Sequence, residues 1–294
     1  MLYGQSVTPS EVSSSLTESQ VANCNLTEQE VPSFVVELTT MLDFNPALNP
    51  CDQLAILESR GACLRSAFRT GLKSDLDLCV AADDLERDLI KWAKTHSVHG
   101  STCAFQTVRD PRSPYAWNGI RHIYGSLQAQ KHWNHWRCTR LLLSRLQEAL
   151  WRRSWPILTS ASRPAPPREH FLAVRNQVAD DICSAAAYNL GSDSSTAPQE
   201  GSVADGLMLT TSLALAGTCM IEQLAEASVG PDGQRLVHVN KPLHLNRFSQ
   251  ASMQLAWIIE RVDHIAERVG VRWATVVSSF LKGETGVYFE LCRS

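Results

Sequence analysis

Apolar residues recur at intervals of three and four positions along most of the chain, which is the spacing of one face of an α-helix. The clearest early stripe comprises Leu54, Leu57, Gly61, Leu64 and Phe68. A matching stripe near the C-terminus comprises Leu255, Ile258, Val262, Ile265 and Val269, and Gly270 follows where a helix C-cap belongs. We find no convincing run of alternating strand residues and no internal repeat. The pattern therefore predicts an all-α fold.

Three further stretches extend this prediction. Residues 81–96 open with acidic side chains and close with Lys and His, which matches the helix dipole at both ends. Residues 113–153 are rich in helix formers throughout, as one long helix or as two joined near Gly125. The prolines of residues 163–170 then break the chain, and residues 171–190 predict another helix.

The last third of the chain is predicted from its glycines and apolar residues. Gly191 stops the helix before it, and residues 191–202 predict a Ser-rich loop. A short final helix is expected after Gly270, with Trp273, Val277 and Phe280 on one side. The longest apolar stretch, Leu207–Ile221, is interrupted by Thr and Ser and falls short of the roughly 20 residues that a membrane span needs. We therefore expect no membrane association.

Residues 131–146 bring Trp, His and Arg side chains together ahead of a leucine-rich run. On a helix, one inward stripe comprises Trp133, Trp136, Thr139, Leu143, Leu146 and Leu150. Full burial of each large apolar side chain contributes on the order of 1.5–3 kcal/mol. Arg137, Arg140 and Arg145 are expected on the flanks of this stripe, paired with acids of adjacent helices. Core packing is the favoured interpretation of the segment.

The N-terminal part of the chain differs in composition from the rest. Residues 1–27 are rich in Ser and Thr and predict a disordered terminus, whereas residues 28–294 predict one domain of stacked antiparallel helices. Residues 28–44 alternate acidic side chains (Glu28, Glu30, Glu37, Asp43) with apolar ones. Such a segment is either the amphipathic first helix of the domain or a segment that folds onto a coactivator.

Composition and charge narrow the class of protein. The 294 residues are 44% hydrophobic and 19% charged, a balance typical of globular proteins, and the net charge of −3 gives no general reason to expect nucleic acid. The charge is uneven: residues 1–58 hold eight acidic residues and no Lys or Arg, and residues 121–175 hold ten basic residues and two acidic ones. Basic residues spread over amphipathic helices are usually a solvated or intramolecular pairing surface, so we expect DNA contact only indirectly.

The N-terminal sequence and the cysteines indicate a reducing, intracellular compartment. The N-terminus lacks the basic region and sustained apolar core of a signal peptide. The nine cysteines form no Cys-x-x-Cys pair, and their odd number and wide scatter argue against a disulfide framework. We expect an intracellular protein.

No residue is assigned to a metal or cofactor site. His122, His132 and His135, with Cys138 as a weak fourth candidate, lack the acidic or thiolate partner that a zinc site needs, and His96 and His99 fare no better. These histidines are expected on polar helix faces.

An enzyme remains the alternative. Class I terpene synthases are all-α and bind magnesium and a prenyl diphosphate through two acidic motifs, which Asp83, Asp84 and Asp88, and then Asp180 and Ser184, resemble in order. However, Tyr188 replaces the last metal-binding Glu, the acids at 83–88 are expected to open a helix, and the Arg–Tyr diphosphate sensor is absent. No other catalytic motif is present. We therefore predict no enzyme activity, no catalytic residue and no cofactor.

Three segments carry a resemblance to a known family. Residues 129–150 contain a Trp, then Asn, an aromatic and Arg, and an Arg-led aliphatic run, at Trp133, Asn134, Trp136, Arg137, Arg140, Leu141 and Leu142. Residues 178–191 contain Asp-Ile-Cys-Ser before Tyr and Leu-Gly, with Ala187 and Asn189 at the places of a proline and a histidine. Residues 253–281 contain Trp257, Ile258, Ile265, Gly270, Val271 and Ala274. In this order they resemble the C-terminal regulatory region of fungal zinc-cluster transcription factors.

The resemblance covers roughly residues 110–285 and implies an all-α regulatory domain that acts on transcription in the nucleus, for example of a biosynthetic gene cluster. Between the matched segments, residues 206–217 stand where the family has a Trp-Pro-Leu helix, but contain neither Trp nor Pro. The family binds DNA through a six-cysteine zinc cluster, and no such segment occurs here. We expect either a stand-alone regulatory region or a cluster encoded upstream. The implied partners are other transcription factors or coactivators, in a homo- or heterodimer.

Overall fold

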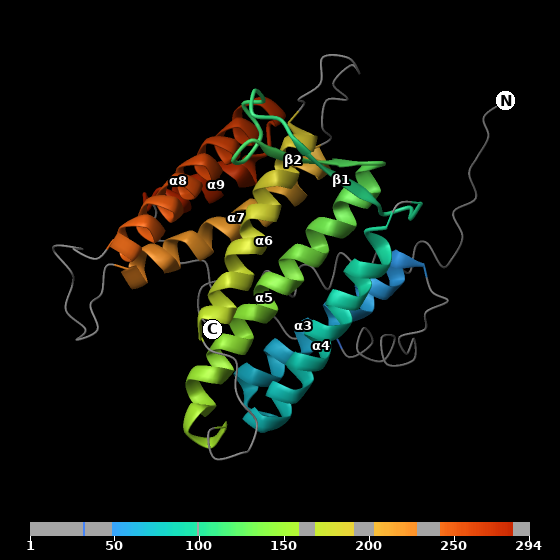
Figure 1. The fold of residues 1–294 in the computed structure, drawn as a ribbon, viewed down its shortest axis with the longest axis vertical. Coiled ribbons are helices and arrows are strands. Elements are labelled where there is room, and N and C mark those ends of the chain that lie inside the picture. Colours follow the sequence, from blue (N-terminus) through green and yellow to red (C-terminus); the bar gives the residue numbers. More distant parts are fainter. Residues whose placement is uncertain are drawn as a thin grey trace. The chain divides into compact units, whose positions relative to one another are not determined.

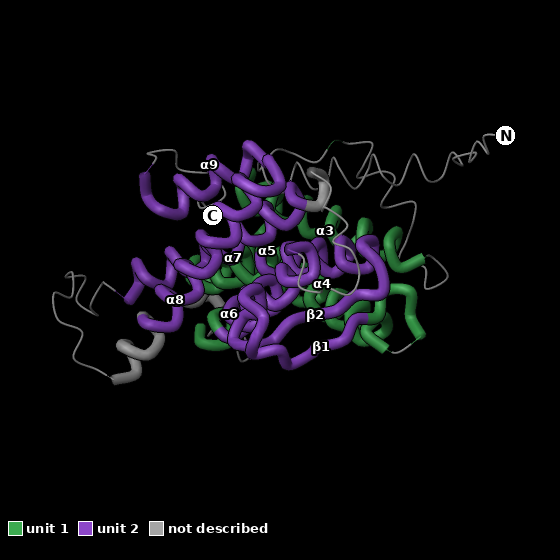
Figure 2. Tube along the Cα trace, turned by 90° about the horizontal axis from the view of Figure 1, so that it is seen from above, with its two compact units in different colours: residues 1–104, 142–172, 293–294 green, residues 105–141, 173–292 purple. Residues whose placement is uncertain are grey.

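The computed structural model of the chain describes residues 32, 49–98, 100–158, 168–190, 203–227 and 242–284, without the side chains of 155–158, 203–205 and 242–248. These residues belong to two compact units (Figures 1 and 2). The predicted disordered terminus, all of the acidic segment except Pro32, and the predicted loop at 191–202 lie outside the described residues.

Unit 1 is built on a helical hairpin. Helix α3 spans Pro50–Thr70 and α4 spans Asp75–His96. The side chain of Asn49 caps α3 by accepting the backbone N–H of Asp52 at 2.9 Å, and Ser74 caps α4 by accepting that of Asp77 at 3.2 Å. Gly71, in the left-handed region at φ 67°, ends α3 and allows the short turn between the helices.

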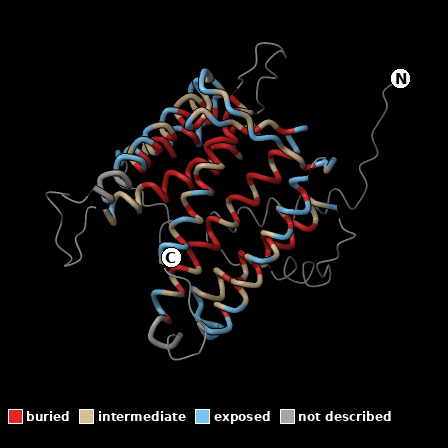
Figure 3. Tube along the Cα trace, in the orientation of Figure 1, coloured by how far each residue is buried: buried red, intermediate tan, exposed pale blue. Residues whose placement is uncertain are grey.

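The hairpin of unit 1 closes at its open end through side chains of α4. Trp92 donates its indole N–H to the carbonyl of Pro50 at 3.0 Å, and the ring of His96 is 3.2 Å from the side-chain oxygen of Gln53. The start of α3 therefore lies beside the end of α4. The predicted stripe of α3 is buried at Leu54, Leu57, Gly61 and Leu64, as expected (Figure 3).

Helix α5, Leu127–Leu158, contributes to both units, since residues up to 141 belong to unit 2 and those from 142 to unit 1. Its predicted inward stripe is confirmed, because Trp133, Trp136, Thr139, Leu143, Leu146 and Leu150 are all buried.

Unit 2 combines a two-stranded hairpin with five helical segments besides its part of α5. The antiparallel strands are β1, Phe105–Arg109, and β2, Ile120–Tyr124, with Phe105 opposite Tyr124. The helices are α6 (Arg168–Asn189, in unit 2 from Ala173), α7 (Val203–Ala227), α8 (Pro242–His264), a π-helical turn η1 (Ile265–Val269) and α9 (Arg272–Leu281). Helices α7, α8 and α9 pack against one another.

Close packing of α7 depends on a glycine. A Cβ atom at Gly217 would lie 2.7 Å from a methyl carbon of Leu281 on α9 and 3.5 Å from one of Ile258 on α8. Gly270, at φ 76°, caps η1 as predicted, and Ile258, Val262 and Ile265 are buried. The all-α prediction is confirmed, since β1 and β2 form the only sheet of the described residues.

The predicted helix over residues 113–153 is wrong in its first part. Residues 120–124 form strand β2 instead, and the helix begins at Leu127. Asn118 and Gly119 both have positive φ, 52° and 71°, in the tight turn between Trp117 and Ile120. Two consecutive residues of this kind form a hairpin turn and cannot continue a helix.

Two smaller predictions are also corrected. Helix α4 begins at Asp75, so the acids at 83–88 lie in its middle and the helix dipole does not explain them. Trp273 is exposed, because α9 buries the face of Ala274, Val277 and Leu281.

By length and composition, residues 206–227 of α7 could cross a membrane, although the sequence predicts that the interrupted stretch is too short. With 56% of its apolar window buried, α7 equally meets the description of a core helix.

Candidate functional site

A buried arginine lies at the centre of unit 2. Arg137 projects from α5, and only 1% of it is exposed. It donates to Nδ1 of His122 at 3.1 Å and to the side-chain oxygen of Asn134 at 3.3 Å. Its guanidinium carbon also lies 5.6 to 5.9 Å from the ring centres of Phe105, Tyr124 and Trp133. The cation is thus enclosed by aromatic rings of both strands and of its own helix. Arg137 and Arg145, both expected on the flanks of the stripe, are buried.

The environment of Arg137 fixes the protonation of its neighbours on β2. A guanidinium has no acceptor, so Nδ1 of His122 must accept from it, and the ring proton is on Nε2. Burial, with the Arg137 charge in addition, lowers the pKa of His122 to about 3. Burial raises the pKa of Tyr124, against the opposing effect of Arg137. His122 is therefore a neutral hydrogen-bond acceptor at physiological pH.

Helix α6 supplies two carboxylates to the same centre. Burial raises the pKa of Asp181, and the nearby charge of Arg137 partly offsets this. Burial likewise raises the pKa of Asp180, whose Oδ1 accepts the indole N–H of Trp117 at 2.7 Å and the amide of Gln254 at 3.1 Å. Asp180 thus joins the hairpin loop, α6 and α8 through a single oxygen atom.

A second arginine holds the loop between β1 and β2. Arg261 of α8 is 7% exposed and donates to the carbonyl of Pro114 at 2.8 Å. Its guanidinium lies over the rings of Tyr115, at 5.3 Å, and Trp257, at 5.1 Å. Trp257 in turn contacts Trp117 edge to face at 5.5 Å between ring centres. The hairpin and its loop are therefore fixed to α5, α6 and α8 by charged side chains.

We call this set the buried polar centre: Arg137, His122, Tyr124, Asp180, Asp181, Trp117, Gln254 and Arg261. It joins the three segments that carry the family resemblance, at 129–150, 178–191 and 253–281, to the hairpin. Asn134, Arg137 and Asp181 belong to those segments and were identified from the sequence. The hairpin residues were not, because the strands were not predicted.

Three of the histidines predicted on polar faces are buried instead, whereas His135 is partly exposed. His96, His122 and His132 are between 4% and 9% exposed, and His99 lies outside the described residues. Within the part of the chain that is described, no three His, Cys, Asp or Glu side chains are grouped so that they could hold a metal ion. The seven cysteines in those ranges are thiols.

The residues of the enzyme alternative are engaged with the protein itself. In unit 1, Asp84 pairs with Arg87 on the same helix, and Asp88 pairs with Arg60 of α3 at 2.6 Å. Asp83 accepts from Gln147 at 3.4 Å. In unit 2, Ser184 is buried, and Asp180 accepts the two hydrogen bonds described above. Each acid therefore has a structural role within its own unit.

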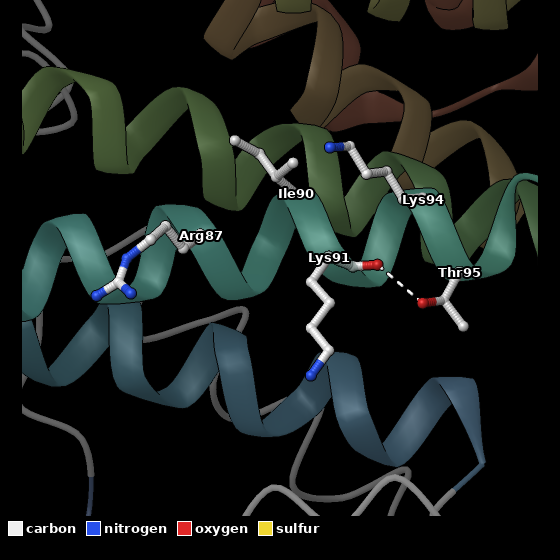
Figure 4. A pocket seen from close by; sticks show the side chains of 5 residues that line it. All are labelled: Arg87, Ile90, Lys91, Lys94 and Thr95. Carbon is white, nitrogen blue, oxygen red and sulfur yellow. Dashed lines mark hydrogen bonds between the residues drawn. The ribbon is translucent and has the colours of Figure 1, made fainter.

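A groove of about 470 Å³ lies along α4 in unit 1. The described residues that line it are Arg87, Ile90, Lys91, Lys94 and Thr95 (Figure 4). Their spacing of three and four places them on one side of α4, whereas Leu85, Leu89 and Trp92 on its other side are buried. We call this the basic groove, because three of these five side chains are cationic. It suits an acidic partner that also has apolar side chains.

No protein family, curated protein or solved structure matches the chain.

Proposed function

We propose that the chain is the helical regulatory domain of a transcription regulator, acting through contacts with other proteins, and that it reaches DNA only through a partner. The main support is the buried polar centre. The segments that resemble the regulatory region of fungal zinc-cluster factors are distant in sequence, yet their polar residues meet: the charge of Arg137 acts on Asp181, and Gln254 donates to Asp180. A buried ionic network of this kind contributes little net stability but helps to specify a single arrangement of helices.

Two further observations support a binding role over catalysis. The acids of the magnesium alternative are engaged in ion pairs and hydrogen bonds, and the basic groove offers cations and one aliphatic side chain rather than metal ligands. A groove with this lining binds acidic, amphipathic segments, which are common in activators and coactivators. A nuclear location and control of a biosynthetic gene cluster belong to the same proposal.

The proposal is tested by tethering the whole chain to a promoter through an unrelated bacterial DNA-binding domain. We expect reporter transcription to change at least severalfold relative to that domain alone. The matched variants are Arg137→Met, which disrupts the buried polar centre, and Arg140→Met, which changes a partly buried arginine one turn later. Only the first should abolish the effect.

The purified chain should also be incubated with magnesium and prenyl diphosphates. We expect no release of diphosphate above that of the buffer. Release that is lost in Asp84→Ala, together with a silent reporter, would replace the proposal with the enzyme alternative.

A further inference from the structure

We propose that the acidic segment at residues 28–44 docks into the basic groove of α4 within the same chain. Its meaning for regulation rests on the proposed function, but the contact itself does not. Docking would cover a segment that otherwise binds a coactivator, so a coactivator and α4 would compete for it.

The groove has the chemistry that such a segment needs. Arg87, Lys91 and Lys94 follow one another at intervals of four and three, and span seven residues, or about 10 Å, along α4. Ile90 and the methylene stems of the lysines supply apolar surface between the charges. Figure 4 shows the side chain of Lys91 at one edge of this face of α4, and those of Ile90 and Lys94 at its opposite edge.

The segment has the complementary chemistry. Within residues 1–58 there is no Lys or Arg, so the segment carries no cation of its own that could neutralise Glu28, Glu30, Glu37 or Asp43. Its apolar residues recur at intervals of three and four, at Val31, Phe34, Val35, Leu38 and Leu42. A helix with this pattern presents an apolar stripe flanked by acids, which matches a basic groove with an aliphatic strip.

The connection to α3 brings the segment to the correct end of α4. Residues 45–49 join it to Pro50, whose carbonyl accepts the indole N–H of Trp92 at 3.0 Å. Trp92 lies between Lys91 and Lys94 in sequence, so the linker starts within about one helical turn of the groove. Five residues span at most about 17 Å, which is enough to pass around α4. A tether this short gives an effective concentration on the order of millimolar, so even a weak contact is populated.

The first test is zero-length carbodiimide cross-linking of the full chain, with the products identified by mass spectrometry. We expect Glu37 or Asp43 to be joined to Lys91 or Lys94. An equal mixture of ¹⁵N-labelled and unlabelled chains should give only light–light and heavy–heavy products. Mixed products would show that a second copy fills the groove, and products that avoid both lysines would show that the segment docks elsewhere. Either result overturns the proposal.

The second test is hydrogen exchange of residues 34–44. Lys91→Glu with Lys94→Glu should speed exchange there roughly tenfold, because two attractions become two repulsions. Lys73→Glu, an exposed lysine at the other end of the α3–α4 hairpin, is the control and should change nothing. When Glu37→Lys and Asp43→Lys are added to this groove variant, the opposite charges face one another again and protection should return. A misfolded α4 would not allow that recovery. If Lys91→Glu with Lys94→Glu left the exchange of residues 34–44 unchanged, docking would be contradicted. It would also be contradicted if adding Glu37→Lys with Asp43→Lys failed to restore protection. Neither result bears on the tethered-reporter experiment, so the two proposals can fail separately.

Discussion

Replacing Arg137 with methionine tests how far the buried polar centre depends on this one side chain, since breaking a buried network costs more than the whole network contributes. Methionine retains most of the apolar stem and gains sulfur–aromatic contacts that roughly replace the cation–aromatic ones. The two hydrogen bonds from the charged guanidinium, to His122 and Asn134, are lost. At about 1.5 kcal/mol for each charge-assisted bond, the expected loss is about 3 kcal/mol in the free energy of unfolding. Arg140→Met should cost less than Arg137→Met, since Arg140 is only partly buried and its guanidinium lies over Trp136 at 5.2 Å.

Urea unfolding of the full chain, followed by far-UV circular dichroism, measures both variants. With a slope near 3 kcal/mol per molar, Arg137→Met should lower the midpoint by about 1 M. A double-mutant cycle with Asp181→Asn should give a coupling energy of at least about 1 kcal/mol, because Arg137 offsets the effect of burial on Asp181. If Arg137→Met proved no more costly than Arg140→Met, or if the coupling were zero, Arg137 would not be the centre of a network.

Three other variants probe the same region. Asp180→Asn should keep both hydrogen bonds, because its amide oxygen can accept from Trp117 and Gln254 as Oδ1 does. Its stability at pH 7 should therefore equal or exceed that of the wild type. Asp180→Ala, which loses both hydrogen bonds, should be less stable. Folding raises the pKa of Asp180 above its usual 3.8, so the wild type bears a penalty above the folded pKa that disappears as the pH falls towards 3.8. The urea midpoints of Asp180→Asn and of the wild type should therefore differ less at pH 4 than at pH 7. A difference of the same size at both pH values would contradict this. His122 behaves oppositely: its folded pKa of about 3 lies below its usual 6.5, so it carries no penalty above pH 6.5 and increasingly destabilises the fold as the pH falls from 6.5 towards 3. His122→Asn should flatten that part of the stability profile, and an unchanged slope would show that another group titrates. Gly119→Ala should cost about 1–2 kcal/mol by thermal unfolding, because φ 71° is left-handed and the new Cβ would lie 3.2 Å from Pro111; a cost near zero would mean that the turn relaxes.

The helices could be predicted from the sequence because each buries one stripe. The spacing of Leu54, Leu57 and Leu64, and that of Ile258, Val262 and Ile265, follows directly from packing on a single face. The start of α4 was misplaced because acidic residues recur along the helix. Ser74, whose hydroxyl accepts the N–H of Asp77, is the local signal that locates it.

The hairpin could have been predicted from Asn118–Gly119, the dipeptide that favours a two-residue turn with positive φ. The helix formers after Gly125 obscured it. The burial of Arg137 could not be predicted from local sequence, since an arginine on a helix flank is normally solvated. It depends on rings contributed by β1 and β2, which are distant in sequence and were not predicted as strands.

The regulatory role is tested most directly by measuring all transcripts of the source organism in cells that carry the wild-type chain, no chain, Arg137→Met or Arg140→Met. We predict that a common set of transcripts changes by more than about twofold in the deletion and in Arg137→Met, and that Arg140→Met matches the wild type. A deletion that leaves every transcript unchanged, in cells shown to express the wild-type chain, would contradict a role in transcription.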